Sequence, residues 1–199
     1  MINDVMRNVK VYGLHESIKA SKYPMAVDVD RCSYDMTPTV MKLATCAPGT
    51  GHDQFLTGII AQFDLTFSIK AWVEAERYHF LDFVSSQSTM HKIVSLDPEL
   101  QCNEYVHPGT INLVKGLIDE YNARQTPTNY LRLLYNVPVG FRLTARMTTN
   151  YRQLKTIYHQ RKNHRLPEWR DFCRQIEELP HSELITGSCG ERRTEEGTE

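Results

Sequence analysis

The fold is best predicted from the stretch Asn136-Val137-Pro138-Val139-Gly140-Phe141 and the polar segment that follows it. Apolar spacing predicts the longest helix of the chain from about Gly140 to Asn163. One stripe of that helix would be apolar and consist of Met147, Tyr151, Leu154 and Tyr158. Asn150 and Arg161 are eleven residues apart, about three helical turns, so they would project on nearly the same side. Two polar side chains aligned beside a core stripe indicate a ligand site.

Other elements are predicted on both sides of this segment. Alternating apolar and polar side chains from Phe63 to Ala71 predict a half-buried strand, and a helix is expected from Val73 to Phe83. Near the N-terminus, a short β-like stretch around Val9 turns at Gly13 into a helix that Pro24 ends. Further helices are predicted over residues 37–44, 108–121, 127–134 and 169–179.

Length and charge restrict the class of protein. The chain has 199 residues without a Pro/Gly/Ser-rich linker, which predicts one domain over residues 1–185. Residues 186–199 have too few apolar side chains to order themselves and are expected to be a flexible tail. The formal charge of −1 gives no reason to expect nonspecific binding to nucleic acid or to a membrane. Phosphate recognition would have to be local.

The cysteines argue for a reducing compartment. They are odd in number, widely spaced and without CxxC pairs, which argues against a disulfide framework and against a zinc or other metal site. We therefore expect reduced thiols in a cytoplasmic protein. We also expect a soluble protein, because no apolar run approaches the ~20 residues that a membrane span requires. The five are Cys32, Cys46, Cys102, Cys173 and Cys189.

Three segments resemble the flavin-dependent thymidylate synthase family, in the family's own order. First, Gly51-His52 with the later strand Phe63-Asp-Leu-Thr-Phe-Ser-Ile-Lys-Ala71 looks like the family's Gly-His loop and Phe-Thr-Phe-x-x-Lys-Ala strand, with a longer spacer. Second, residues 77–92 occupy the place of the signature Arg-His-Arg-x-x-Ser-x-Asn-Glu-x-Ser-x-Arg. Third, residues 137–154 resemble the Leu-Pro … Asn-x-Arg-x-Leu helix, which puts Asn150, Arg152 and Arg161 on family positions.

The signature segment departs from the family. Aligned by Lys70-Ala71, the Arg-His-Arg triplet falls on Leu81-Asp82-Phe83, so two guanidinium groups that would grip phosphate and pyrimidine are absent. Aligning Ser85-x-Gln87 with Ser-x-Asn instead puts Lys92 on the terminal Arg, at the cost of a one-residue gap. In either register the acidic position holds Ser88 or Thr89. The register stays open.

Neighbouring residues offer replacements for the lost donors. Arg77 and His79 precede the vacant triplet on the same predicted helix, and the run Ser85–Thr89 has hydroxyl, amide and backbone donors suited to a phosphate. The expected flavin-binding residues are His52, Arg77, His79, Ser85 and Asn150. The expected nucleotide-binding residues are Ser86, Gln87, Ser88, His91, Lys92, Arg132 and Arg161. Gln87 and Arg161 are the expected catalytic residues.

The resemblance implies an α/β (α+β) fold, a central sheet with long helices, and a homotetramer with active sites shared between subunits. It implies transfer of a methylene from methylenetetrahydrofolate to C5 of dUMP and its reduction with FAD and NADPH, without an enzymic nucleophile. Arg or amide donors would stabilise negative charge on the uracil. Gln87, Arg132 and Arg161 are the candidates.

Alternative interpretations remain from the sequence. A relative with the same flavin scaffold would methylate or hydroxymethylate UMP or dCMP, and a non-catalytic nucleotide-binding protein would have lost the flavin. His52 also fits an exposed turn histidine, since lone histidines are common. Asn150 and Arg161 also fit the solvated face of a basic helix, which carries many charges.

Overall fold

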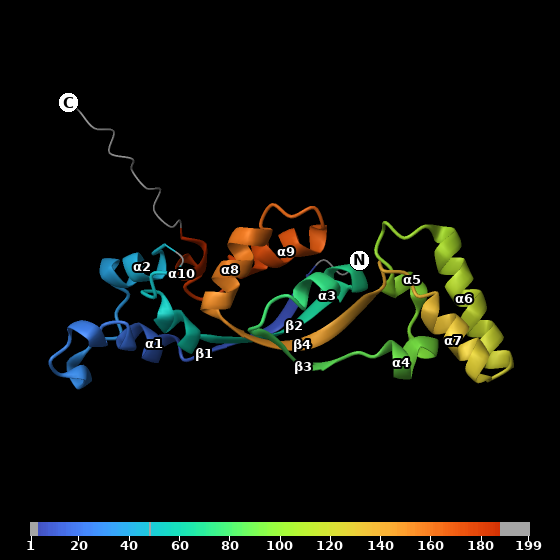
Figure 1. Ribbon diagram of the computed structural model, residues 1–199, viewed down its shortest axis with the longest axis horizontal. Coiled ribbons are helices and arrows are strands. Elements are labelled where there is room, and N and C mark those ends of the chain that lie inside the picture. Colours follow the sequence, from blue (N-terminus) through green and yellow to red (C-terminus); the bar gives the residue numbers. More distant parts are fainter. Residues whose placement is uncertain (1–3, 48, 188–199) are drawn as a thin grey trace, which may run out of the picture.

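A four-stranded antiparallel sheet forms the centre of the protein (Figure 1). The computed structural model describes residues 4–47 and 49–187. The strand order is β1-β2-β4-β3, with β1 Met6–Tyr12, β2 Ile60–Ser68, β3 Leu81–Ser86 and β4 Arg142–Asn150. The two inner strands, β2 and β4, pair along their whole length from Ile60 opposite Asn150 to Ser68 opposite Arg142. They form the frame on which the other elements are placed.

Helices surround this sheet unevenly. In Figure 1, α3, α8 and α9 lie along one side of the sheet, whereas α4 to α7 gather at one end of the molecule. The α-helices are α1 Leu14–Ala20, α2 Pro38–Ala44, α3 Ile69–Ala75, α4 Thr89–Lys92, α5 Pro98–Gln101, α6 Pro108–Ala123, α7 Pro127–Tyr135, α8 Tyr151–Arg161, α9 Pro167–Ile176 and α10 Glu183–Thr186. Short 3-10 turns are η1 Tyr23–Met25, η2 Val29–Arg31, η3 Gln54–Gly58 and η4 Ile93–Ser95.

The main core lies between the sheet and the pair α8 and α9. Alternate residues of β2 point into it, and Phe63 and Phe67 are fully buried. Phe67 packs against Trp169 with ring centroids 4.8 Å apart, and Phe63 packs against Phe172 at 5.5 Å. Burial of such aromatic side chains contributes a large share of the apolar stabilisation of a small domain. This packing fixes α9 on the sheet.

A second apolar cluster supports the end of the molecule that holds α4 to α7. Its buried members are Ile93, Cys102, Val114, Leu117, Leu133 and Phe141. Phe141 immediately precedes β4, and its carbonyl accepts a hydrogen bond from the Ile69 amide at 2.9 Å. The quoted stretch at residues 136–141 therefore joins this cluster to the sheet.

Most predicted elements are confirmed. The strands near Val9 and Phe63 are β1 and β2, and the helices predicted over residues 14–22, 37–44, 108–121, 127–134 and 169–179 are α1, α2, α6, α7 and α9. Thr37 begins α2 as expected, because its hydroxyl accepts a hydrogen bond from the Val40 amide at 3.3 Å. The tail predicted for residues 186–199 lies outside the described residues from position 188 onward, and Thr186 ends α10.

The long helix predicted from Gly140 to Asn163 is wrong in its first half. Residues 142–150 form β4, and only residues 151–161 form the helix α8. Ala145, Met147 and Thr149 are buried at every second position, which is the period of a strand. Threonine-rich segments favour strands because a branched Cβ fits the pleated sheet better than a helix.

The helix predicted from Val73 to Phe83 is also wrong beyond Ala75. The α3 helix ends there, and β3 begins at Leu81, which pairs with Thr149 of β4. The Thr149 hydroxyl donates to the Phe80 carbonyl at 2.6 Å and fixes the turn into β3. Pairing with β4 therefore overrides the local helical pattern.

In the described ranges, no helix combines the length and the apolar character needed to cross a membrane.

The substitution Gly13→Ala tests the conformation of the turn between β1 and α1. The φ of Gly13 is 71°, and a Cβ there would lie 2.5 Å from the Gly58 carbonyl oxygen. We expect Gly13→Ala to lower the free energy of unfolding by about 1–3 kcal/mol in urea titrations, because it adds both backbone strain and a clash. The control is Gly116→Ala in α6, where nothing lies within 4 Å. It should raise that free energy by about 0.5–1 kcal/mol. Equal midpoints for the two variants would contradict the described turn.

Candidate functional site

Two adjoining hollows follow α8. The larger has a volume of about 850 Å³ and is bounded by α8, η3 and Gly49 of the loop before η3. The smaller has a volume of about 400 Å³ and is bounded by α8 and the segment that connects α3 to β3. They share Phe80, Gln153, Thr156 and Gln160 as lining residues. Volumes of about 300–1,000 Å³ are typical of small-molecule sites.

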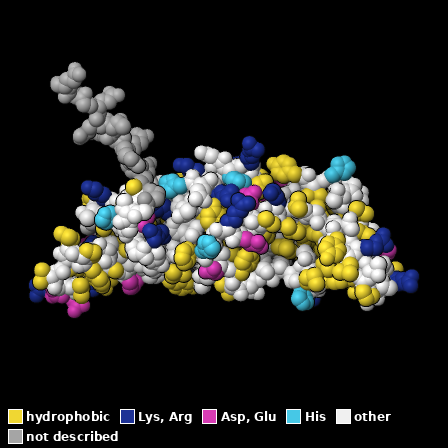
Figure 2. Space-filling model, in the orientation of Figure 1, with side chains coloured by type: hydrophobic (Ala, Val, Ile, Leu, Met, Phe, Trp, Pro, Cys, Tyr) yellow, Lys and Arg dark blue, Asp and Glu magenta, His cyan; other side chains and the backbone are white. Residues whose placement is uncertain are grey.

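Basic side chains line both hollows. Figure 2 shows Lys and Arg side chains gathered near the middle of one face, where α8 and α9 lie. The larger hollow is lined by Arg152, Lys155, His159 and Lys162 of the α8 segment, and the smaller by Arg77, His79 and Arg161. Asp53 is the sole carboxylate among the described residues that line them. An excess of cations in a cleft favours an anionic ligand.

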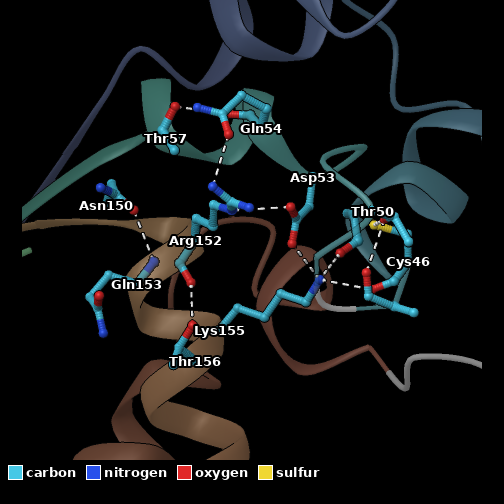
Figure 3. A network of polar contacts seen from close by, with 12 residues as sticks. Cys46, Thr50, Asp53, Gln54, Thr57, Asn150, Arg152, Gln153, Lys155 and Thr156 are labelled. Atoms are coloured by element: carbon cyan, nitrogen blue, oxygen red, sulfur yellow. Dashed lines mark hydrogen bonds and ion pairs between the residues drawn. The ribbon is translucent and has the colours of Figure 1, made fainter. Parts of the chain in front are cut away.

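A buried carboxylate holds two of these cations in place (Figure 3). Asp53 is 5% exposed, and its oxygens lie 2.9 Å from Lys155 Nζ and 3.1 Å from Arg152 Nε. Lys155 Nζ also donates to the carbonyls of Ala44 at 2.6 Å and Cys46 at 3.3 Å. Lys155 therefore ties the loop after α2 to α8. Such a paired and fully bonded arrangement is what buried charges require.

Arg152 spans the boundary between this network and the larger hollow. Its Nη1 donates to Gln54 Oε1 at 2.8 Å while its Nε faces Asp53. The guanidinium group is thus oriented by two fixed partners on one side. Because the group has five N–H donors in a planar fork, the side that faces the hollow keeps donors for a ligand.

Asn150 has a structural role at the start of α8. Its side-chain oxygen accepts a hydrogen bond from the Gln153 amide at 2.9 Å, so it is the N-cap of the helix. The prediction that Asn150 and Arg161 project from one face of a single helix is therefore wrong. Asn150 lines the larger hollow, whereas Arg161 lines the smaller one.

Arg161 is held by a second acidic centre. Its Nε donates to the Tyr78 hydroxyl at 2.7 Å, and its Nη1 lies 3.2 Å from Glu74 Oε2. The guanidinium carbon lies 4.9 Å from the centroid of the Trp169 ring, within cation–π range. With a side chain only 15% exposed, Arg161 does not belong to a solvated helix face.

Glu74 also accepts a hydrogen bond from a neighbouring histidine, His164. His164 Nδ1 accepts from the Leu166 amide at 3.2 Å, which leaves the proton on Nε2, 3.2 Å from Glu74. Burial, with help from nearby arginines such as Arg161, lowers the pKa of His164 although Glu74 favours its protonated form. A neutral imidazole therefore donates to Glu74 at neutral pH.

His159 in the larger hollow is neutral for a related reason. Its burial, followed by the charges of Lys162 and Lys155, lowers the pKa of His159 below its ordinary value. At neutral pH the positive charge of this hollow therefore comes from Arg152, Lys155 and Lys162.

The predicted serine-rich phosphate loop is largely a strand. Ser85 and Ser86 belong to β3 and pair with β4. Gln87 extends this pairing, because its amide donates to the Thr144 carbonyl at 2.9 Å and its side-chain oxygen accepts from the Thr144 amide at 2.8 Å. Ser88 Oγ lies 3.0 Å from His91 Nδ1 at the start of α4. The prediction that residues 85–89 form a loop whose backbone donors are free for a phosphate is therefore wrong for residues 85–87, which pair with β4.

The predicted site residues do not all meet within one chain. His91 and Lys92 lie on α4, which Figure 1 places with α6 and α7 away from α8. None of the residues Ser85, Ser86, Gln87, Ser88, His91 and Lys92 lines either hollow beside α8. Arg132 lies on α7, paired with Glu120 at 2.6 Å.

The other predicted residues lie closer to α8. Arg77 and His79 line the smaller hollow, although from a connection rather than from the predicted helix. His52 is exposed and directly precedes Asp53 on the loop beside the larger hollow. No group of three or more His, Cys, Asp or Glu side chains within the described ranges could hold a metal ion.

Sequence reasoning missed several residues of these hollows. Lys155, His159 and Lys162 follow Arg152 at positions that face one side of α8, and this spacing is readable once the start of the helix is known. Asp53 and Glu74 could not be paired with these cations from the sequence, because Lys155 is 102 residues from Asp53 and Arg161 is 87 residues from Glu74. The local pairing of Glu74 with Lys70, four residues earlier, does not indicate a site.

The fold is that of the flavin-dependent thymidylate synthases. The chain resembles ThyX from Helicobacter pylori complexed with FAD and dUMP, with a TM-score of 0.70 and 14% identity over 91% of this chain and 97% of that one. A second Helicobacter pylori ThyX structure with FAD and dUMP has a TM-score of 0.68 and 15% identity over 92% of this chain and 100% of that one.

A methylase has the same fold. The UMP/dUMP methylase PolB from Streptomyces cacaoi, bound with 5-Br dUMP, gives a TM-score of 0.61 and 14% identity over 88% of this chain and 91% of that one. No protein-family model and no curated protein sequence matches the chain. At these identities the likeness defines the fold.

Asp53→Asn tests the buried ion-pair network. We expect the free energy of unfolding in urea to fall by about 3–5 kcal/mol, because the variant leaves Lys155 in a buried place without the carboxylate that faces it. Glu120→Gln is the matched control, since it removes the partner of the exposed Arg132 and should leave the midpoint nearly unchanged. If Asp53→Asn unfolded at the same urea concentration as Glu120→Gln, the network would not stabilise the fold.

Proposed function

We propose that this protein is a flavin-dependent enzyme that methylates C5 of dUMP, with methylenetetrahydrofolate as the carbon donor and NADPH as the reductant of FAD. The observation that carries the proposal is the pair of cation-lined hollows along α8. Its support from comparison is the shared fold with ThyX proteins crystallised with FAD and dUMP. A cytoplasmic location, inferred from the cysteine spacing, completes the proposal.

The larger hollow fits the chemistry of a flavin dinucleotide. Arg152 and Lys162 would hold the pyrophosphate as cationic donors, and the amides of Asn150 and Gln153 add neutral donors. Phe80 is 61% exposed at the boundary of the two hollows, where it offers an aromatic face for stacking. When bound, the flavin would supply the hydride chemistry. His52 would lie beside it on the loop before η3.

The smaller hollow fits a pyrimidine nucleotide beside the flavin. Arg77 and His79, which the sequence led us to expect at the flavin, would bind the nucleotide phosphate instead, because they line this hollow from the connection between α3 and β3. Arg161 would direct an N–H group toward the pyrimidine and stabilise negative charge that develops on it. Glu74 and Tyr78 hold this guanidinium in one orientation, and preorganised donors stabilise a transition state best.

Two alternatives follow from particular observations. The likeness to a UMP/dUMP methylase supports methylation of UMP, or a related C5 modification of another pyrimidine nucleotide. The absence of the Arg-His-Arg triplet from Leu81-Asp82-Phe83 supports a non-catalytic nucleotide-binding protein without flavin. The choice of nucleotide and the retention of flavin separate these alternatives.

The remaining predicted residues fit a homotetramer with shared active sites. Ser85, Ser86, Gln87, Ser88, His91 and Lys92 lie away from the hollows of their own chain. In a homotetramer they would complete the site of a neighbouring copy, with Gln87 as the amide donor to the pyrimidine. The exposed surface of β3, where Val84 is 57% exposed, is available for such a contact.

Flavin binding tests the proposal directly. Purified protein should keep the visible absorption of FAD after removal of the excess, and should oxidise NADPH when dUMP is added. Arg152→Ala should bind FAD about 10–100-fold more weakly, because it loses charged hydrogen bonds to the pyrophosphate. Arg124→Ala, at the end of α6 outside the hollows, is the control.

Arg161 provides the corresponding test for the nucleotide. Arg161→Lys keeps the charge but loses the planar fork, so dUMP affinity should fall while the protein stays folded. Unchanged dUMP affinity in Arg161→Lys and Arg161→Ala would contradict the placement of the nucleotide. Binding of dUMP without FAD would favour the non-catalytic alternative, and higher turnover with UMP or dCMP would identify another substrate.

Oligomeric state tests the shared site. Light scattering should give four times the 23.1 kDa mass of one chain. Gln87→Ala and Arg161→Ala should each be inactive alone, and a refolded mixture should regain part of the activity because some sites receive both intact residues. A monomer with full activity would contradict site sharing, and so would a mixture that stays inactive although it forms mixed tetramers.

A further inference from the structure

A third hollow, outside the α8 region, contains an unpaired buried acid. It has a volume of about 510 Å³ and lies between the residues before β1, the segment 103–105 and the first turns of α9. Glu168, in the first turn of α9, is 8% exposed and lines it. Its Oε1 atom is buried and has no hydrogen-bond partner within residues 4–47 and 49–187. Glu168 also lines an adjoining hollow of about 370 Å³.

Such a carboxylate is unusual in a folded protein. Buried polar atoms are nearly always hydrogen-bonded, and an exception in a native structure points to a ligand, an ion or a functional strain. The two acids at the centre of the α8 sites, Asp53 and Glu74, have several donors each. Glu168 is the exception among the buried acids described.

The charges around this hollow favour a cation. Arg174 pairs with Asp171, both at its border. Arg142 donates from Nη2 to the carbonyls of Leu100 at 3.0 Å and Cys102 at 3.4 Å and from Nε to that of Gln101 at 3.3 Å, which holds this part of its guanidinium at the end of α5. Three further carboxylates at the border, those of Asp4, Glu104 and Glu168, have no salt-bridge partner in the described part of the chain.

We infer that this hollow binds a small organic cation whose ammonium or guanidinium N–H groups donate to the carboxylate of Glu168. An ionised carboxylate is an acceptor only, so its partner must supply N–H or O–H donors. A guanidinium fork matches a carboxylate geometrically, and a charged donor best offsets the burial of the anion. Asp4 and Glu104 attract the rest of a polycation at the open side. The described acids do not form a metal-binding group.

This site is independent of the proposed flavin and nucleotide chemistry. The hollow at Glu168 shares no lining residue with either of the two hollows along α8. The ligand can therefore bind whether or not the protein is a thymidylate synthase, and its binding can be measured without flavin or nucleotide.

Agmatine, which carries one guanidinium and one ammonium group, is the probe. Titration calorimetry at low salt should show saturable binding with one site per chain, and the melting temperature should rise with agmatine concentration. Urea at the same millimolar concentration is the neutral control for the guanidinium shape and should give no binding signal. L-Arginine, which adds a carboxylate, should bind more weakly because of repulsion by Asp4 and Glu104.

Glu168→Gln is the decisive variant, because it keeps the shape of the side chain and removes its charge. It should bind agmatine at least tenfold more weakly and should melt at the same or a higher temperature without the probe. Glu178→Gln, which lies outside the hollow, should bind like the parent, and so should Arg152→Ala. The inference is overturned if agmatine does not bind, or if Glu168→Gln binds it with the parent affinity.

Discussion

The junction of β4 and α8 at Asn150 is the constraint on which the rest of this structure depends. Asn150 pairs with Ile60 as the last residue of β4, and its side chain caps the helix that begins at the next residue. The Tyr151 amide also donates to the Ile59 carbonyl at 3.0 Å. Because strand register and helix cap meet at one residue, α8 can leave the sheet in only one direction. Its basic side and its buried side follow from that direction.

Two acids then orient the basic side chains of α8: Asp53, which is buried, and Glu74, whose side chain is 15% exposed. The chain as a whole has a formal charge of −1, so a basic cleft depends on where charges are placed and not on their number. Asp53 orients Arg152 and Lys155, whereas Glu74 orients Arg161. Each acid holds its cations in a defined geometry at the edge of a hollow. The same fold carries nucleotide chemistry in proteins that share little of this sequence, which is expected when function depends on such placed groups.

Much of the fold could be predicted from local patterns. Alternation identified β2, and proline near the first turn with apolar spacing identified α2, α6 and α7. The errors at residues 140–150 and 76–83 have one cause, since β3 and β4 pair with each other. A helical and an extended conformation were both compatible with those segments, and only the partner strand selects the second. The placement of Arg161 beside a hollow was expected, whereas its partners Glu74 and Tyr78 were not.

The sequence by itself determined the elements with local causes, such as caps, turns and side-chain periodicity, and it carried the resemblance at Asn150, Arg152 and Arg161. Only the tertiary structure decided which charges are paired. Lys155 meets Asp53 across 102 residues, whereas the buried Oε1 of Glu168 has no hydrogen-bond partner among the described residues. The reason is that periodicity acts over a few residues, whereas burial and Coulomb energy depend on distances in space that the chain order does not contain.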